Sequence, residues 1–277
     1  MSLIPVAIDI DTGTDQLLCA IRERVAIITL NRPDARNALS DFLTPALRRM
    51  IRERAADDRV GALLITGAGT AFCAGGDVKG MGAHSNKNSM TETERLADLI
   101  ERERTLTGAL VAVPKPTIAA LPGAAAGAGL AIALACDIRI AAQSAFVSAG
   151  YSKIGFSGDY GIGWLLTRTV GSPIARELMF TSDRIDSARA ERIGLFNRVV
   201  ADDLLQIEAF TFARSLANGP ALALRQIKKN LDEAASIDFD TALVHEAEGI
   251  VKLAATDDHR EAVQAFIEKR KPVFTGR

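Results

Sequence analysis

Histidine and cysteine are scarce in this chain of 277 residues, which contains three of each. The cysteines are widely spaced and odd in number, and the sequence has neither a Cys-x-x-Cys nor a His-x-x-x-His pair; they are Cys19, Cys73 and Cys136. Such a set favours reduced thiols over a disulfide framework and over metal ligands. We therefore expect a cytoplasmic protein without a metal site.

An excess of charge of one sign is also missing, because 33 basic residues stand against 34 acidic ones, a net charge of −1. This balance offers no electrostatic footprint for nucleic acid. The uncharged run from Thr117 to Cys136 is long enough to cross a bilayer, but alanine and glycine dominate it and Pro122-Gly123 interrupts it. We expect a buried strand, turn and helix there, and no membrane partner. The first eleven residues include two aspartates and no basic residue, which does not match a signal peptide.

Motifs for nucleotide phosphates and for a serine nucleophile are absent too. In the two glycine clusters the third position of a dinucleotide fingerprint is Phe72 or Ile132, and no Gly-Lys-Ser/Thr follows either cluster. Residues 155–159 come close to a nucleophile elbow, but Asp159 replaces its last glycine. The three histidines lie far from these turns in the sequence, which argues against a Ser–His–acid triad.

Glycine is plentiful, in contrast, and two glycine-rich segments stand out. They are Gly67-Ala-Gly-Thr-Ala-Phe-Cys-Ala-Gly-Gly-Asp77 and Pro122-Gly-Ala-Ala-Ala-Gly-Ala-Gly129. Each follows a short β-branched run, so each is expected to begin where a strand ends. Two such turns can direct two backbone N–H groups at one small volume, which is how a protein stabilises an oxyanion without a charged side chain. The pair predicts chemistry at an ester or thioester carbonyl.

Apolar periodicity and turn residues predict a mixed α/β chain. Strands are expected at 25–30, 60–66, 117–121, 138–141, 145–148 and 195–200. Helices are expected at 40–56, 94–110, 127–135, 160–170, 173–180 and 187–193, followed by four helical segments from 202 to 270. Strand–strand–helix units wound into a spiral fit this order better than a doubly wound sheet, which needs a steadier alternation. We expect a spiral core over residues 1–200 and a C-terminal helical region over residues 201–277.

Seven motifs, in matching order and spacing, resemble the enoyl-CoA hydratase/isomerase (crotonase) family over nearly the whole chain, from about residue 24 to residue 274. They are Asn31-Arg-Pro-Asp-Ala-Arg-Asn-Ala-Leu-Ser40, Ala71-Phe-Cys-Ala-Gly-Gly-Asp-Val-Lys79, Pro122-Gly with Gly127-Ala-Gly-Leu-Ala131, Ala135-Cys-Asp-Ile-Arg139, Tyr151-Ser-Lys-Ile-Gly-Phe-Ser-Gly-Asp159, Gly194-Leu-Phe-Asn-Arg-Val-Val200 and Ala265-Phe-Ile-Glu-Lys-Arg270. The resemblance implies an α/β spiral of ββα units that binds an acyl-CoA thioester. Coenzyme A would enter as part of the substrate, and no separate cofactor is expected.

The resemblance also implies which residues act. The oxyanion donors would be the backbone N–H groups of Gly76 and Ala128, the second at the start of the short buried helix, where the helix dipole adds to the hydrogen bond. Coenzyme A would contact a set of loop and C-terminal residues: Asp34, Ala35, Arg36, Ala74, Lys79, Lys269 and, from a neighbouring subunit, Phe266. The C-terminal helices would build a homotrimer or a hexamer.

The chain departs from the hydratases of this family at both acid/base positions. The hydratases use two glutamates, but the matching residues here are Ala131 and Tyr151. Neither alanine nor a tyrosine with its ordinary pKa near 10 can act as a carboxylate base at neutral pH. Asp159 falls at the position that double-bond isomerases of the family use as acid/base, so isomerisation is expected in preference to hydration. Ala131, Tyr151 and Trp164 are expected to line the substrate pocket.

Other functions stay open at this point. Asp159 could instead steer water onto a carbonyl, which would hydrolyse a thioester or a carbon–carbon bond. The chain could also be a catalytically silent subunit that only binds acyl-CoA. Asp159 itself has a purely structural alternative, because aspartate is a favoured cap for a helix such as the one expected to follow it.

Overall fold

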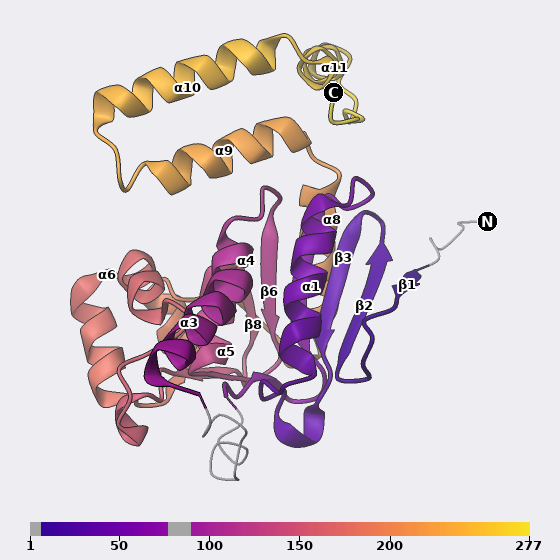
Figure 1. Ribbon diagram of the computed structural model, residues 1–277. Helices are drawn as coiled ribbons and strands as arrows, with labels where there is room; N and C mark the ends of the chain where they lie inside the picture. Colours follow the sequence, from indigo (N-terminus) through magenta and orange to yellow (C-terminus); the bar gives the residue numbers. More distant parts are fainter. Residues whose placement is uncertain (1–6, 77–89) are drawn as a thin grey trace.

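The computed structural model describes residues 7–76 and 90–277 (Figure 1). Within these residues the strands form two sheets. The larger sheet has the order β1-β2-β3-β4-β6-β8-β11, with the bounds Ile8–Ile10, Leu17–Arg22, Val25–Leu30, Ala62–Gly67, Thr117–Leu121, Ile138–Ala142 and Arg198–Val200. The smaller sheet has the order β10-β9-β7-β5, with the bounds Ile185–Asp186, Phe146–Ser148, Ala124–Ala126 and Ala71–Cys73.

The helices lie mainly in the second half of the chain. In chain order they are α1 (Leu43–Ala56), α3 (Glu92–Glu103), α4 (Ala109–Val111), α5 (Ala128–Ala135), α6 (Ile162–Thr181), α7 (Ser187–Arg192), α8 (Leu205–Ala217), α9 (Ala221–Glu233), α10 (Phe239–Ala254) and α11 (Asp257–Ile267). A π-helical turn, Arg104–Gly108, joins α3 to α4, and 3₁₀ turns lie at Pro33–Ala35, Ser152–Ile154 and Asp202–Leu204.

A repeating unit relates the two sheets. A strand of the larger sheet leads to a short strand of the smaller sheet, and a helix comes next in the described chain: β4-β5-α3, β6-β7-α5 and β8-β9-α6. Within each sheet the strands of successive units are parallel neighbours. Each unit therefore adds one strand to each sheet, which is the expected spiral of ββα units.

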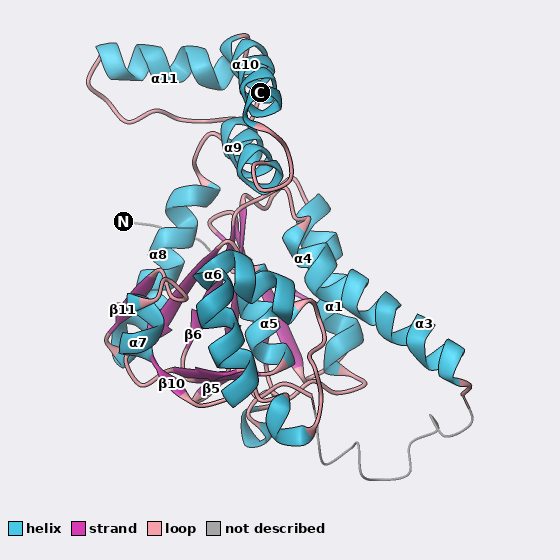
Figure 2. Ribbon diagram, turned by 90° about the vertical axis from the view of Figure 1, so that its left-hand side faces the viewer, coloured by secondary structure: helices cyan, strands magenta, loops and turns pink. Residues whose placement is uncertain are grey.

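Helices cover both faces of the larger sheet. Helix α8 lies against β3, β4, β6 and β8, and α1 lies against β2 and β3 on the other face (Figure 2). Ala209 and Ala213 of α8 are fully buried, so this helix packs into the core although it belongs to the expected C-terminal region. Helices α9, α10 and α11 instead extend beyond the sheets, at the top of Figure 1. None of the helices in the described ranges is long and apolar enough to cross a membrane.

Many elements lie where the sequence predicts them. Strands β3 and β6 have the predicted bounds, and four helices follow residue 202. The two helices expected at 160–170 and 173–180 form one helix, α6, that is kinked at Gly171. Strands β5 and β7 lie inside the two glycine-rich segments, where the sequence predicts only turns. They were missed because a three-residue strand such as Ala124–Ala126 has little strand propensity of its own.

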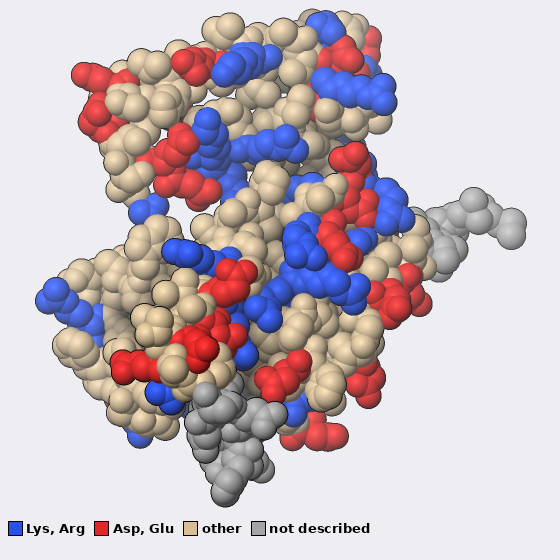
Figure 3. Space-filling view, in the orientation of Figure 1, with Lys and Arg blue, Asp and Glu red and all other residues tan. Residues whose placement is uncertain are grey.

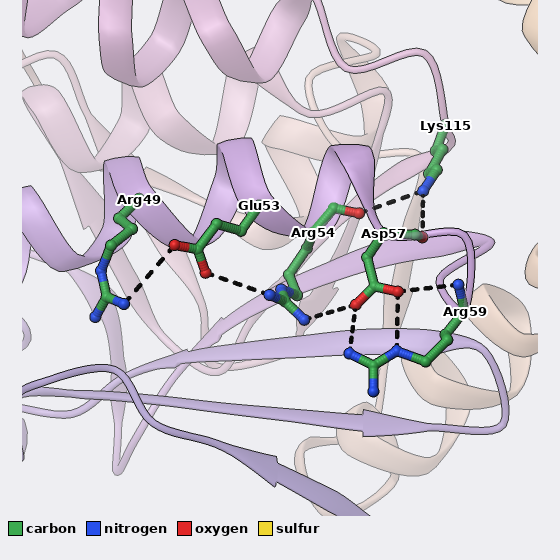
Figure 4. A network of polar contacts seen from close by, with 6 residues as sticks. All are labelled: Arg49, Glu53, Arg54, Asp57, Arg59 and Lys115. Carbon is green, nitrogen blue, oxygen red and sulfur yellow. Dashed lines mark hydrogen bonds and ion pairs between the residues drawn. The ribbon is translucent and has the colours of Figure 1, made fainter.

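Polar contacts fix the C-terminal end of α1 beside the start of β6 (Figure 4). The Asp57 carboxylate contacts Arg54 and Arg59 at 2.7 Å each, and the Lys115 ammonium group donates to the Asp57 carbonyl oxygen at 2.7 Å. The hydrogen bond from Arg59, the largest cause, lowers the pKa of Asp57 to about 2. On the face in Figure 3, basic and acidic side chains lie among one another, as the near-zero net charge suggests.

Helix α5 contacts the smaller sheet so closely that its second residue has to be glycine. A Cβ atom at Gly129 would lie 2.2 Å from the carbonyl oxygen of Cys73 in β5 and 2.7 Å from the Cys73 Cβ. All eight residues of α5 are buried, so the helix cannot move away toward solvent.

Gly129→Ala is therefore expected to lower the free energy of unfolding by about 1–3 kcal/mol through overpacking. Gly163→Ala is the matched control, because Gly163 lies in α6 with open space around its Cβ position, and alanine there adds up to about 1 kcal/mol of stability. Urea unfolding followed by circular dichroism measures both values. Equal stabilities for the two variants would contradict the packing of α5 on β5.

Candidate active site

The two glycine-rich segments meet backbone to backbone at the residues expected to supply the oxyanion donors. A Cβ atom at Gly75, whose φ is +92°, would lie 2.7 Å from the Ala126 carbonyl oxygen and 3.4 Å from the Ala128 amide nitrogen. Gly76 follows directly and pairs with Leu39 in an isolated parallel bridge. The structure thus brings the residue before Gly76 against the turn that leads into Ala128.

The Ala128 amide lies at the start of a helix. Gly127 precedes it with a φ of +52°, and the Gly127 N–H donates to the Ser148 carbonyl oxygen in β9 at 3.1 Å. As the first residue of α5, Ala128 has no intrahelical acceptor for its N–H, and none of the other described residues accepts from it. Among the described residues nothing competes for this donor, which is therefore available to an anionic oxygen, and the helix dipole favours negative charge there.

Asp159 lies in the loop before α6, and its side chain does not cap that helix. The N-cap residue of α6 is Gly161, and no side chain caps it. The capping role considered for Asp159 is therefore wrong. Instead, the Tyr151 hydroxyl donates a hydrogen bond to Asp159 Oδ1.

Tyr151 connects Asp159 to the turn that presents the Ala128 amide. A Cβ atom at Gly127 would lie 3.8 Å from both the Cζ and the hydroxyl oxygen of Tyr151, so the phenol packs against this turn. Tyr151 is only 6% exposed, and Asp159 is half-buried. The resemblance to the family assigns both residues to one site, but nothing in the sequence predicts the bond between them.

Burial dominates the electrostatics of this pair. It raises the pKa of the Asp159 carboxyl above its ordinary value, while the hydrogen bond from Tyr151 lowers it and the charge of Glu103 raises it. Burial, followed by the hydrogen bond to Asp159, also raises the pKa of the Tyr151 hydroxyl. Asp159 is thus a stronger base than an ordinary aspartate, and Tyr151 stays protonated at physiological pH.

The residues expected to contact coenzyme A fall into two groups. Asp34 and Ala35 lie in the 3₁₀ turn Pro33–Ala35, and Arg36 follows it. Asp34 and Arg36 are exposed, and Ala35 is partly buried. The Ala74 N–H donates to the Arg36 carbonyl oxygen at 2.9 Å. These four residues therefore lie together beside the first glycine-rich segment. Asn37, the next residue of this segment, fixes the loop: its side chain accepts from the Arg32 N–H and donates to the Ala68 and Ala71 carbonyl oxygens.

Of the other expected coenzyme A contacts, only Phe266 and Lys269 lie within the described residues. Lys79 lies outside the described residues. Phe266 of α11 is 84% exposed, and Lys269 is exposed just beyond that helix. Both views place α11 above the sheets and α5 within the lower body (Figures 1 and 2).

The residues expected to line the substrate pocket are also separated. Ala131 is fully buried in α5, one turn after Ala128. Trp164 of α6 stacks on Arg168 and lines a cavity of about 440 Å³ at the C-terminal end of α5, about 10 Å from its start. Leu224, Ile227 and Leu231 of α9 form another wall of that cavity. The assignment of Trp164 and Ala131 to a substrate pocket therefore stays a prediction.

Cysteines and an aspartate near the glycine-rich segments have structural roles. All three cysteines are buried, and burial raises the pKa of the Cys73 and Cys136 thiols to about 12, so they are unreactive packing residues. Asp137 is structural, because its carboxylate accepts from the Thr117 N–H at 2.8 Å and pairs with Lys228 at 2.9 Å.

The chain is similar in sequence to known proteins. The sequence profile of the family Enoyl-CoA hydratase/isomerase matches residues 20–277. The 1,2-epoxyphenylacetyl-CoA isomerase of Escherichia coli K12 is 36% identical over 94% of this chain and 98% of its own length. A Mycobacterium leprae protein named "Probable enoyl-CoA hydratase echA8" is 39% identical over 95% of this chain and 99% of its own length.

A solved structure shows the same fold. The crystal structure of a protein assigned as an enoyl-CoA hydratase in Streptomyces coelicolor A3(2) covers all of this chain and all of its own, at 36% identity and a TM-score of 0.89. The match extends over both sheets and the C-terminal helices. The chain therefore belongs to the enoyl-CoA hydratase/isomerase family, whose members act on acyl-CoA thioesters.

Proposed function

We propose that this protein isomerises a double bond in an acyl-CoA thioester, with the Gly76 and Ala128 amides as the oxyanion hole and Asp159 as the acid/base. The observation that carries the proposal is the bond between Asp159 and Tyr151, because Tyr151 packs against the turn before Ala128. A carboxylate base and an oxyanion donor are thereby connected through one buried side chain. A half-buried carboxylate with a raised pKa suits the removal of a proton from carbon.

The reaction needs no co-reactant. Asp159 takes a proton from C2 of a 3-enoyl thioester, and the C–H electrons move onto the carbonyl oxygen to give a dienolate. The two amides bind that oxygen, and losing one such donor typically costs about 3 kcal/mol of transition-state stabilisation. The protonated Asp159 then returns the proton to C4, so the double bond lies between C2 and C3. The substrate is neither oxidised nor reduced overall, so the reaction needs no redox cofactor. Coenzyme A enters only as part of the substrate.

Hydration is disfavoured by the groups at the two glutamate positions. Ala131 has no titratable group, and the pKa of Tyr151 is raised above its ordinary value. Neither residue can deprotonate a water molecule at neutral pH. The relatives with the word hydratase in their names therefore do not fix the reaction of this chain.

We further propose that the loop of Asp34, Ala35 and Arg36, with Ala74, binds the coenzyme A part of the substrate. Its exposure and its backbone bond to the first glycine-rich segment support this role. Phe266 and Lys269 would reach that loop only from another subunit of a homotrimer or a hexamer. Large apolar side chains exposed on α9, α10 and α11 support self-association; they include Leu231, Phe239, Ile250 and Val251.

Asp159→Asn is expected to slow isomerisation of a 3-enoyl-CoA by about 10²–10⁴-fold, because the proton then lacks an acceptor. In heavy water the wild-type product gains deuterium without the mass of added water, which mass spectrometry detects. Because the base must be ionised, the wild-type rate falls as the pH drops through the raised pKa of Asp159.

The control for this variant is Asp183→Asn, which removes an aspartate that is 70% exposed and pairs with Lys153 on the surface. It is expected to keep the wild-type rate. Equal rates in both variants would overturn the role of Asp159. A product heavier by one water would indicate hydration, and free thiol detected with Ellman's reagent would indicate thioester hydrolysis.

Ala128→Pro is expected to lower the rate of 3-enoyl-CoA isomerisation by about 10²–10³-fold, the effect of losing one oxyanion donor. Proline is favoured at the first position of a helix, so it removes this N–H without breaking α5. Ala128→Gly keeps the N–H and serves as the control, and thermal unfolding shows whether both variants are folded. A proline variant with the wild-type rate would exclude this amide from the site.

Light scattering is expected to give three or six times the chain mass of 29.5 kDa. The reason is that the exposed apolar faces of α9, α10 and α11 are covered when subunits associate. A single-chain mass at micromolar concentration would contradict the proposed assembly and would leave Phe266 and Lys269 without a role in binding coenzyme A.

A further inference from the structure

Tyr151 is held in one orientation between two parts of the candidate site. Its carbonyl oxygen accepts hydrogen bonds from the Ile154 and Phe156 N–H groups, both at 3.0 Å, which fixes its backbone. Its ring packs on the turn at Gly127, and its hydroxyl donates to Asp159 Oδ1. Within the described residues no hydrogen bond reaches Asp159 Oδ2.

We infer that Tyr151 is a positioning residue for Asp159: it holds Oδ1 and leaves Oδ2 as the oxygen that exchanges a proton with the substrate. The inference rests on the proposed function of Asp159 and extends it. A carboxylate attached to a long loop can rotate, and a base that is misplaced by 1 Å loses much of its rate. The phenol removes that freedom and ties the base to the backbone turn that presents the Ala128 amide.

A phenol suits this task better than a charged donor. An arginine or lysine in its place would lower the pKa of Asp159 strongly and weaken the base. The neutral hydroxyl lowers this pKa less than burial raises it. Because burial and the bond to Asp159 keep the hydroxyl protonated, Tyr151 donates at every pH of interest and does not itself carry the proton.

Charged side chains on α1 and α3 act on Asp159 and on its neighbour Tyr160. Glu103 at the end of α3 raises the pKa of Asp159. The charges of Arg102 of α3 and Arg48 of α1 lower the pKa of Tyr160, the next residue in the chain. Tyr160 is also buried, and burial raises its pKa to about 12, but its hydroxyl forms no hydrogen bond within the described residues. It is therefore the matched control for removing a buried phenol hydroxyl beside Asp159.

The first test compares the pH dependence of isomerisation in Tyr151→Phe and Tyr160→Phe. Removing the bond to Oδ1 withdraws a stabilising contact from the ionised carboxylate, so the pKa of Asp159 rises and the acid limb moves to higher pH. At a pH on that limb the Tyr151→Phe rate is expected to fall about tenfold below the wild-type rate. Tyr160→Phe is expected to keep the wild-type profile. Coincident profiles for the two variants would overturn the positioning role.

The second test does not depend on activity. The chain has only two tyrosines, so a Tyr160→Phe protein made with 3-fluorotyrosine carries fluorine at Tyr151 alone. Its ¹⁹F NMR signal is expected to shift as Asp159 titrates, and the shift is expected to vanish when Asp159→Asn is added. A signal that does not titrate, or that titrates equally with Asn at 159, would refute the contact.

The two ideas fail in different ways. If Asp159→Asn isomerises as fast as the wild type while the fluorine signal still reports Asp159, the proposed function is wrong and the contact stands. If Asp159→Asn is inactive but Tyr151→Phe keeps the wild-type pH profile, Asp159 is the base and Tyr151 does not position it.

Discussion

The rest of the candidate site depends on the side-chain-free contact between the two glycine-rich segments. Gly75 lies against Ala126 and Ala128, and Gly129 lies against Cys73, at distances that leave no room for a Cβ atom at either glycine. The parallel pairing of β5 with β7, whose register shifts between Ala71 and Cys73, holds the two backbones side by side. Because amide groups stay within hydrogen-bonding reach of a single oxygen only if their backbones approach this closely, the contact is a precondition for the proposed oxyanion hole.

The candidate base comes from a different unit of the spiral and needs its own support. Asp159 lies between β9 and α6, in a loop where Tyr160 has a φ of +51° and Gly161 a φ of +73°. A non-glycine residue in that left-handed region costs energy and persists only where its surroundings enforce it. Here burial of Tyr160 and the bond between Tyr151 and Asp159 do so. A side chain therefore holds the candidate base in place, whereas backbone contacts hold the two amides in place.

The sequence predicts the frame of this site better than its contacts. Strands Val25–Leu30 and Thr117–Leu121 are apolar runs bounded by turn residues, so local pattern alone defines them. Strand Ala124–Ala126 escapes prediction because only its pairing with two neighbours makes it a strand. The resemblance to the family picks out Tyr151 and Asp159, but no periodicity rule brings together two loop residues eight positions apart. Trp164 likewise lies near the other end of α5 because of the path of the loop before α6. Composition does not encode that path.

Main-chain donors and a side-chain base respond differently to substitution. An amide N–H persists whichever residue occupies Gly76 or Ala128, provided the backbone keeps its path, so the proposed oxyanion hole tolerates change in the residues around it. A side-chain acid/base group has no such protection, since an alanine in its place, such as Ala131, has no titratable group. A chain that keeps the backbone contact can therefore gain a new base on another loop and change its reaction without changing how it binds the thioester oxygen. In the proposed mechanism Asp159 has that role, and the buried Tyr151 is the side chain that fixes its position.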